Sequence, residues 1–204
     1  SLETDGNVEI GAEAKTSFKE GSVFNVLDQT DLVGKILGAA GINMMADFAD
    51  KTNTSHITIG KTGSIKSGGD TDISAANSTV IKLNAVTPAK KTGEAISEAL
   101  PVVSVGVVNQ LNNALVDVYG DIGSGGDLGI KASADTFIEV TTKSATEVKE
   151  DPDAPEENLI YISVGVIDTN TDAAVNLHSG GKAITAEGAV DISATVSEDV
   201  SMEV

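Results

Sequence analysis

The residues best suited to bind a metal ion are aspartates beside glycine pairs. Asp70 and Asp72 occur in SGGDTDISA at 67–75, and Asp127 occurs in SGGDLGIKA at 124–132. Carboxylate oxygens are the ligands that calcium prefers. Glycine- and aspartate-rich nonapeptides also bind calcium in some β-solenoids. The phrase is therefore a candidate calcium site.

Two looser copies of the phrase favour a different role. TDGNVEIGA at 4–12 has Asn7 at the aspartate position, and AEGAVDISA at 186–194 has Ala189 there. Because alanine cannot be a ligand, we interpret the phrase as a turn. In such a turn glycine supplies a positive φ and Asp or Asn caps its own backbone.

A second acidic cluster follows Val148. It consists of Glu150, Asp151, Asp153, Glu156 and Glu157 and includes two prolines. Calcium binding is one interpretation, but charge runs of this kind are ordinarily solvated, so we predict an exposed loop.

The remaining candidates for catalysis are isolated. His56 and His178 each border a strand-like run, and no serine or cysteine is placed to complete a triad, so we interpret both as surface residues. Asp117 and Asp191 lie in predicted strands and are expected to point outward. A sugar-cleaving enzyme would need clustered carboxylates and aromatic platforms. We therefore predict no catalytic, cofactor-binding or metal-binding residues, no cofactor, and a protein that is not an enzyme.

Composition and charge exclude several classes of function. The net charge is −18, and all 13 basic residues are lysine, which argues against a nucleic-acid partner. There is no cysteine, so disulfides and thiolate metal sites are excluded. The longest apolar run, around 99–108, is about half of the ~20 residues that a membrane helix needs, so no membrane span is expected.

The chain repeats itself about every 60 residues. Aligning the phrase places Ile10, Ile73, Ile130 and Ile192 at one position, with separations of 63, 57 and 62 residues. The neighbouring apolar positions fall at even intervals, which is the period of a strand. Regular self-similarity of this kind is typical of solenoids.

A second block also recurs. VVSVGVVNQLNNALVDV at 102–118 matches IYISVGVIDTNTDAAVNL at 160–177, and a weaker copy is ILGAAGINMMADFADKT at 36–52. In this alignment Gly41, Gly106 and Gly165 occupy one position.

The repeat predicts an all-β fold, a right-handed parallel β-helix. Turn residues divide each repeat into three units, which predicts coils of about 20 residues, ten coils in all, and a rod roughly 40–50 Å long. The alternative is an antiparallel sandwich with one hairpin group per repeat. The chain is expected to form a single β-helical segment, 1–204, with repeat units of roughly 1–63, 64–120, 121–182 and 183–204.

Three stretches do not fit regular coils. Residues 19–37 and 87–100 are predicted to contain short helices, the second from Thr92 to Leu100 before Pro101. Residues 146–158 are the acidic loop. All three lie at the same point of the repeat, so they are expected to leave the stack at one corner.

The repeats resemble those of a known family. SVGVVNQLNNALVDVYGDIGSGGDLGIKASADTFIEV and EGAVDISATVSEDVSMEV look like repeats of large bacterial exoproteins of the filamentous haemagglutinin type. This group is secreted by the two-partner (type V) route and includes leukotoxin-like filamentous adhesins. The resemblance covers nearly all of 55–204 and, more weakly, 1–54. It implies a virulence role in cell adhesion, and it carries over no catalytic residue.

The expected function is that of a non-enzymatic structural or adhesive segment of a secreted or surface-attached bacterial adhesin. Its expected partners are a host-cell surface protein or glycan and, for the full-length protein, an outer-membrane secretion partner, with the segment itself a monomer. The alternatives are a β-helical carbohydrate-active enzyme or sugar-binding module, or part of a leukotoxin-like toxin.

Overall fold

The described part of the chain is built almost entirely of strands. The computed structural model describes residues 1–19, 24–25, 43–88, 102–145, 161–178, 180 and 183–204. Within these ranges there is no helix, and hence none long and apolar enough to cross a membrane. The strands form three four-stranded sheets, and all neighbouring strands run parallel except for one short pair.

Sheets A and B take one strand from each of four successive coils, whereas sheet C takes two strands from the first coil and one from each of the next two. Sheet A contains the short strands β1 (Leu2–Thr4), β5 (Ser64–Ser67), β8 (Asp121–Ser124) and β11 (Ile184–Ala186). Sheet B contains β2 (Val8–Lys19), β6 (Thr71–Pro88), β9 (Leu128–Ala145) and β12 (Val190–Glu203). Sheet C contains β4 (Asn43–Ile59), β7 (Val102–Val118) and β10 (Tyr161–Leu177), with β3 (Phe24–Asn25) antiparallel to β4.

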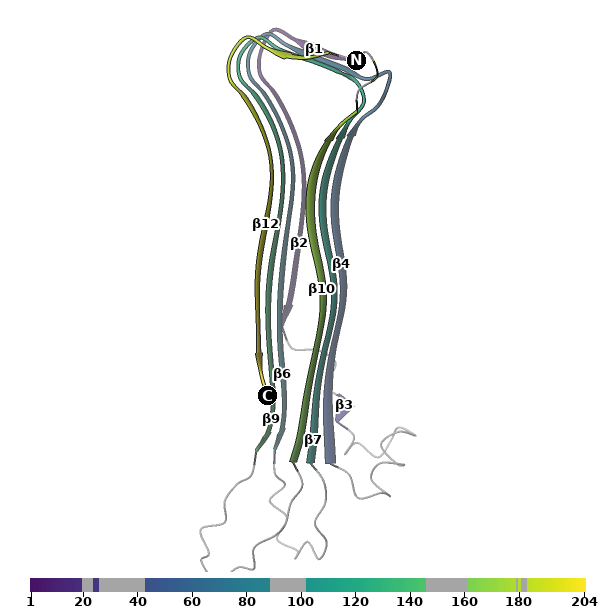
Figure 1. Cartoon of the computed structure of the whole chain (residues 1–204), viewed down its shortest axis with the longest axis vertical. Helices are drawn as coiled ribbons and strands as arrows, with labels where there is room; N and C mark the ends of the chain where they lie inside the picture. Colours follow the sequence, from purple (N-terminus) through teal and green to yellow (C-terminus); the bar gives the residue numbers. More distant parts are fainter. Residues whose placement is uncertain (20–23, 26–42, 89–101, 146–160, 179, 181–182) are drawn as a thin grey trace, which may run out of the picture.

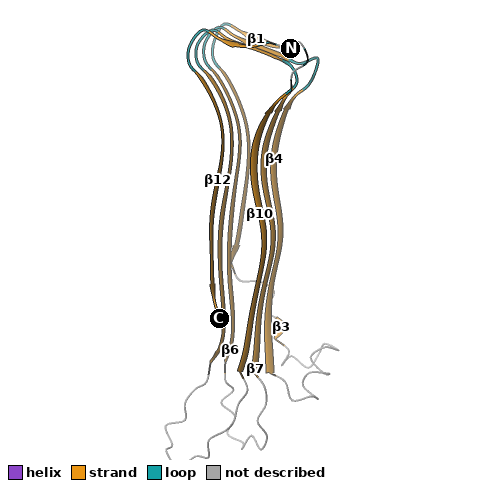
Figure 2. Cartoon of the chain, viewed as in Figure 1, coloured by secondary structure: helices purple, strands orange, loops and turns teal. Residues whose placement is uncertain are grey.

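The chain therefore winds through the sheets in the order A, B, C and returns to A, as in a parallel β-helix. Sheets B and C are long and face each other, and sheet A joins them at one end (Figure 1). Turns and loops at that end connect the short strands to the long ones (Figure 2). The antiparallel sandwich is wrong, because the long strands of sheet B and those of sheet C run parallel to one another. The right-handed winding stays a prediction.

One coil of the β-helix contains a whole repeat of about 60 residues. Ile10 pairs with Ile73, Ile73 with Ile130, and Ile130 with Ile192 on adjacent strands of sheet B. The predicted coil of about 20 residues is therefore wrong, and so are the ten coils. The chain forms three coils and the first two strands of a fourth.

The predicted rod dimension is wrong for the same reason. The long axis of the molecule runs along the strands (Figure 1). A strand of 17 residues, such as β7, spans about 56 Å at 3.3 Å per residue. The stack of coils is only about 14 Å deep, from three steps of about 4.8 Å.

Polar residues inside the long strands explain the error in coil length. Asn77, Asn112 and Asp172 are of residue types that commonly form turns, yet all three lie within continuous strands. Asn77, Gln110 and Asn112 are buried between sheets B and C. A strand that meets polar partners across the core does not need to turn at its polar residues.

The core between the two long sheets has two apolar regions. The region nearer sheet A includes Ile57, Ile73, Val116, Ile122 and Ile130. The farther region comprises Ala49, Ile81, Leu83, Val108, Ile138 and Val140, with Phe18 and Ile167 packed against it. The strand register aligns Phe18, Ile81, Ile138 and Val200 in one column, eight residues after the isoleucine column.

A layer of hydrogen-bonded polar side chains separates these two regions. Asn53 on β4 donates to the carbonyl oxygen of Ser78 at 3.3 Å. Asn112 on β7 donates to the Thr136 hydroxyl at 2.9 Å, and the Thr171 hydroxyl on β10 donates to Thr136 Oγ1 at 2.8 Å. Buried polar groups cost free energy unless they are paired, so these bonds favour one alignment of sheet C against sheet B.

The register corrects one part of the sequence alignment. Gly106 does pair with Gly165, and residues 102–118 pair with 161–177 throughout, as predicted. Their partner on β4, however, is Asp47 and not Gly41. A Cβ at Gly106 would meet Thr142 and Val140 of sheet B at 2.9 Å, so lack of space across the core explains the glycine.

The predicted insertions lie largely outside the described residues. This applies to both short helices, to the acidic loop and to any calcium site within it. The strand bounds place each of the three breaks between a strand of sheet B and the following strand of sheet C: after Lys19, after Pro88 and after Ala145.

The isoleucine column provides a stability test with an internal control. Ile130 is 0% exposed and Ile192, one coil further, is 42% exposed. Ile130→Ala should lower the free energy of unfolding by about 2–5 kcal/mol, because it leaves a cavity, and Ile192→Ala should cost clearly less. Urea denaturation followed by circular dichroism measures both. Equal losses in the two variants would contradict the inward assignment.

Candidate functional site

The glycine–aspartate phrase forms the corner between sheets A and B and links one coil to the next. Asn7 Oδ1 accepts the backbone N–H of Asp70 at 3.0 Å. Asp70 Oδ1 accepts that of Asp127 at 2.9 Å, and Asp127 Oδ1 accepts that of Ala189 at 2.8 Å. The side chains thus cap the next coil and not their own backbone, which corrects the sequence interpretation. The Ala189 N–H donates the last hydrogen bond of this series, which we call the corner ladder.

The glycine before each of these residues makes room for the side chain of the preceding coil. A Cβ at Gly69 would collide with Asn7 Oδ1, and one at Gly126 would collide with Asp70 Oδ1. Neither glycine has a positive φ, so the predicted conformational reason is wrong. Close approach between coils explains the glycines instead.

Serine hydroxyls hold the same corner from inside. Ser67 Oγ lies within hydrogen-bond distance of the carbonyl oxygens of Gly6 and Asp70, at 2.7 and 3.1 Å. Ser124 Oγ makes the equivalent contacts one coil later, with Gly69 and Asp127 at 2.9 and 2.8 Å. The corner is therefore a hydrogen-bonded turn, as the alanine at 189 suggested.

The structure brings together two histidines that look isolated in the sequence. His56 on β4 donates through Nε2 to Asp117 Oδ2 at 2.8 Å, and His178 donates through Nε2 to Asp117 Oδ1 at 3.2 Å. A carboxylate can only accept, so each Nε2 carries the proton. Asn176 also donates to Asp117 Oδ1, at 3.0 Å. The ring of His178 stacks on Tyr119 with centroids 3.8 Å apart.

The cluster lies on the outer face of sheet C, near sheet A. Val116 and Val118 point into the core, so Asp117 between them points outward, as expected. Its side chain is nonetheless only 13% exposed, because the two imidazoles and Asn176 cover it. Asp191 also points outward and pairs with Lys131 at 3.3 Å.

The geometry of the cluster differs from that of a catalytic triad. In a triad the aspartate and the nucleophile contact different nitrogens of one imidazole. Here the Thr58 hydroxyl lies 3.1 Å from His56 Nε2, the same nitrogen that contacts Asp117. The arrangement therefore orients the imidazole but does not activate Thr58.

Hydrogen bonds to the charged form lower the pKa of Asp117 below its ordinary value. The bond from Asn176 is the largest cause, followed by those from His178 and His56 together with the charge of His56; burial acts in the opposite direction. The cluster thus favours an ionised carboxylate.

A repeat-length spacing was the missed signal for this cluster. His56 and His178 each lie 61 residues from Asp117, one on either side. Because one coil contains about 60 residues, that spacing places His56 and Asp117 on adjacent strands and His178 directly after the end of the next strand, β10. The assumption of 20-residue coils concealed the relation.

An open groove lies at the fourth coil. It has a volume of about 550 Å³ and is lined by Ile167, Thr169, Glu198, Val200 and Met202. Glu198 is the single carboxylate of this lining and accepts a hydrogen bond from Thr169 at 2.9 Å. Glycoside hydrolysis ordinarily needs two carboxylates across the scissile bond. Within the described ranges, no group of three or more His, Cys, Asp or Glu side chains could hold a metal ion.

Comparison with family models, with curated proteins and with solved structures found no match to this chain.

The corner ladder predicts a difference between two substitutions at one residue. Asp70→Ala removes the acceptor for the N–H of Asp127 and should lower the free energy of unfolding by about 0.5–1.5 kcal/mol. Asp70→Asn keeps an acceptor, as Asn7 does, and should cost less. Thermal melts of both variants, in calcium and in chelator, test this. A calcium-dependent rise in Tm that either variant abolishes would contradict the turn assignment.

The histidine–aspartate cluster predicts a dependence of stability on pH. Asp117 has a lowered pKa when folded, so its contribution is present at neutral pH, falls as the pH approaches the unfolded value near 3.9, and is lost below the folded pKa. Asp117→Asn should cost about 1 kcal/mol at pH 7. The difference from the unsubstituted chain should shrink below about pH 4.

Urea denaturation across pH 3–7 measures that difference. Asp168→Asn, on the same face of sheet C, is the matched control for loss of one negative charge. A difference for Asp117→Asn that stays constant from pH 7 to pH 3 would rule out this role of the cluster.

Proposed function

We propose that this chain is a structural and adhesive segment, without enzymatic activity, of a secreted or surface-attached bacterial adhesin of the filamentous haemagglutinin type. The observation that carries the proposal is the in-register pairing of successive coils in all three sheets. Such a stack lengthens by repeating contacts that already exist, and its stability depends mainly on nearest-neighbour coils. This property suits a protein that extends from a cell.

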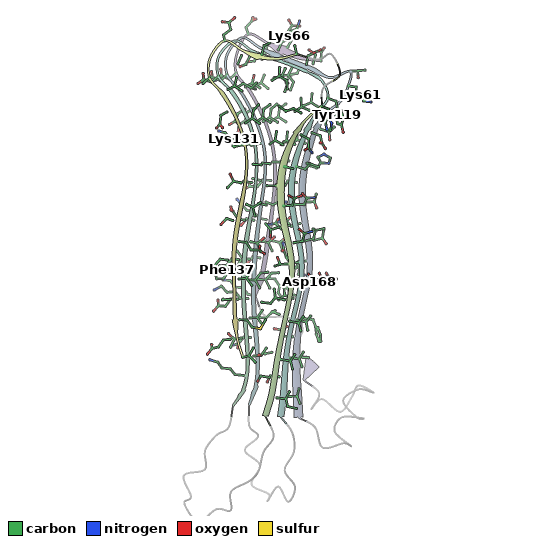
Figure 3. All side chains as sticks on the ribbon, in the orientation of Figure 1. Lys61, Lys66, Tyr119, Lys131, Phe137 and Asp168 are labelled. Atoms are coloured by element: carbon green, nitrogen blue, oxygen red, sulfur yellow. The ribbon has the colours of Figure 1, made fainter. Side chains whose placement is uncertain are left out.

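The outer faces supply the surface for attachment. Sheets B and C present strands of up to 18 residues. Along the whole length of these strands, every second side chain points outward from the core (Figure 3). A rigid face of this kind offers many contacts to a host-cell protein or glycan at little cost in conformational entropy. The proposed outer-membrane secretion partner would act on the full-length protein before this fold forms.

The geometry supports the enzymatic alternative less well. A sugar-cleaving site needs paired carboxylates, and Glu198 is the only carboxylate among the residues that line the groove at the fourth coil. The histidine–aspartate cluster uses one ring nitrogen for both contacts of His56. We therefore favour adhesion over chemistry.

Binding to whole cells tests the proposal. The folded chain is attached to fluorescent beads, which are incubated with epithelial cells and leukocytes at increasing surface density. We expect saturable attachment that free chain competes away. Beads that carry the chain with Ile130→Asp, in which an unpaired buried charge disrupts the core, should attach much less.

The same samples distinguish the alternatives. Release of sugar fragments from polyuronides or host glycans would replace the adhesive proposal with an enzymatic one. Leukocyte lysis would replace it with a toxic one. Attachment that is equal for the Ile130→Asp beads would show that the fold is not involved and would overturn the proposal.

A further inference from the structure

Part of the outer face of sheet C, at the end far from sheet A, is apolar. It consists of Phe48 on β4, Val105 and Val107 on β7, and Val164 and Val166 on β10, and we call it the apolar face. These residues form adjacent rows in the strand register. Phe48 is 49% exposed, Val164 is 40% exposed and Val166 is 47% exposed. Their neighbours in each strand, such as Val108 and Ile167, point into the core.

The same strands look different closer to sheet A. There the outward positions are mainly polar, for example Thr52, Thr54, Asn113 and Asp172. Parallel strands that are apolar on both faces are ordinarily covered on both faces. A contiguous exposed apolar patch on a soluble fold marks an interaction surface. The change from polar to apolar within one strand therefore locates a docking surface.

Acidic residues border the apolar face. Asp50 and Asp168 occupy the next outward row, and Asp50 accepts a hydrogen bond from Asn109 at 3.1 Å. Asp168 lies on sheet C, on the other side of the molecule from the labelled Lys131 and Phe137 of sheet B (Figure 3).

Sheet C differs from sheet B in how its acids are balanced. On sheet B, Lys82 pairs with Glu139 at 2.7 Å and Lys143 with Glu203 at 2.6 Å. The described outward positions of β4, β7 and β10 contain no lysine. A partner that covers the apolar face thus meets negative charge that the strands of this sheet do not neutralise.

We propose that the apolar face docks a segment of another protein in which apolar side chains alternate with basic ones. The apolar side chains cover Phe48, Val164 and Val166, and the basic side chains reach Asp50 and Asp168. A second copy of this chain fits poorly, because each copy carries a net charge of −18 and would bring the same acidic row to the contact. The surface stands independently of the adhesive function.

Synthetic peptides of alternating Leu and Lys serve as probes, with alternating Leu and Glu as the matched comparison. The full chain should bind the Leu–Lys peptide with an affinity that falls as salt rises, and it should not bind the Leu–Glu peptide. Val164→Thr and Val166→Thr should each weaken binding about fourfold, since each replaces a buried methyl group by a hydroxyl. Asp50→Asn with Asp168→Asn should weaken binding and flatten its salt dependence.

Two controls match these variants elsewhere on the chain. Val196→Thr changes a valine of equal exposure, 48%, on β12, and should leave binding unchanged. Asp135→Asn with Asp199→Asn removes two charges from the outer face of sheet B and should leave the salt dependence unchanged.

Several results would overturn the proposal. These are equal binding of both peptides, or equal losses in the control variants. Binding of anionic lipid vesicles that Val166→Thr abolishes, without peptide binding, would assign the face to a membrane instead. Concentration-dependent self-association in sedimentation that Val166→Thr abolishes would assign it to a second copy. Because no host cell is involved, failure here leaves the test of adhesion unaffected.

Discussion

The stacking of equivalent positions in successive coils constrains the whole structure. Each strand pairs in register with the strand one repeat away, so every side chain lies beside its counterparts in the coils before and after it. The residue at each position must therefore pack against the side chains at the equivalent positions of the adjacent coils, as well as against its neighbours within its own coil. Isoleucine at 10, 73, 130 and 192 fills one such column with apolar surface. Asn7, Asp70 and Asp127 fill another with hydrogen-bond acceptors for the next coil.

Stacking alone does not fix how the two long sheets face each other. Two purely apolar sheet faces would slide past one another more readily than patterned faces do, because hydrophobic burial is not directional. The polar layer of Asn53, Asn112, Thr136 and Thr171 adds direction, since its hydrogen bonds form at one alignment only. The layer also allows strands of 17 and 18 residues to continue through a polar stretch without a turn.

Much of the architecture was predictable from the sequence, because a repeat aligns itself. The isoleucine column, the pairing of residues 102–118 with 161–177 and the corner role of the glycine–aspartate phrase all follow from self-similarity. The number of strands per repeat does not follow. An asparagine such as Asn77 or Asn112 looks the same in the sequence whether it forms a turn or belongs to a buried polar layer. The histidine cluster was within reach, since His56, Asp117 and His178 are separated by one repeat. It required the correct coil length, which the sequence alone left open.

The same constraint shapes the surface. Outward side chains also form rows across the coils, so one apolar position per repeat becomes a row of two or three, as Phe48, Val107 and Val166 show. A solenoid therefore converts a short sequence preference into an extended patch, whether apolar, as on sheet C, or charged, as along the lysine–carboxylate pairs of sheet B. This is a physical reason why such a stack suits attachment to other molecules.

The coil length can be measured directly, because the chain has no cysteine and accepts two site-specific spin labels. Ala76 and Thr195 lie on the outer face of sheet B, both in register with Ser133, and are therefore two coils apart. Cysteine substitutions there, labelled and examined by continuous-wave electron paramagnetic resonance, should show strong dipolar broadening from a backbone separation of about 10 Å. Coils of about 20 residues would place the two positions about 29 Å apart, from six steps of about 4.8 Å. A spectrum without broadening, identical to the sum of the singly labelled chains, would contradict the structure described here.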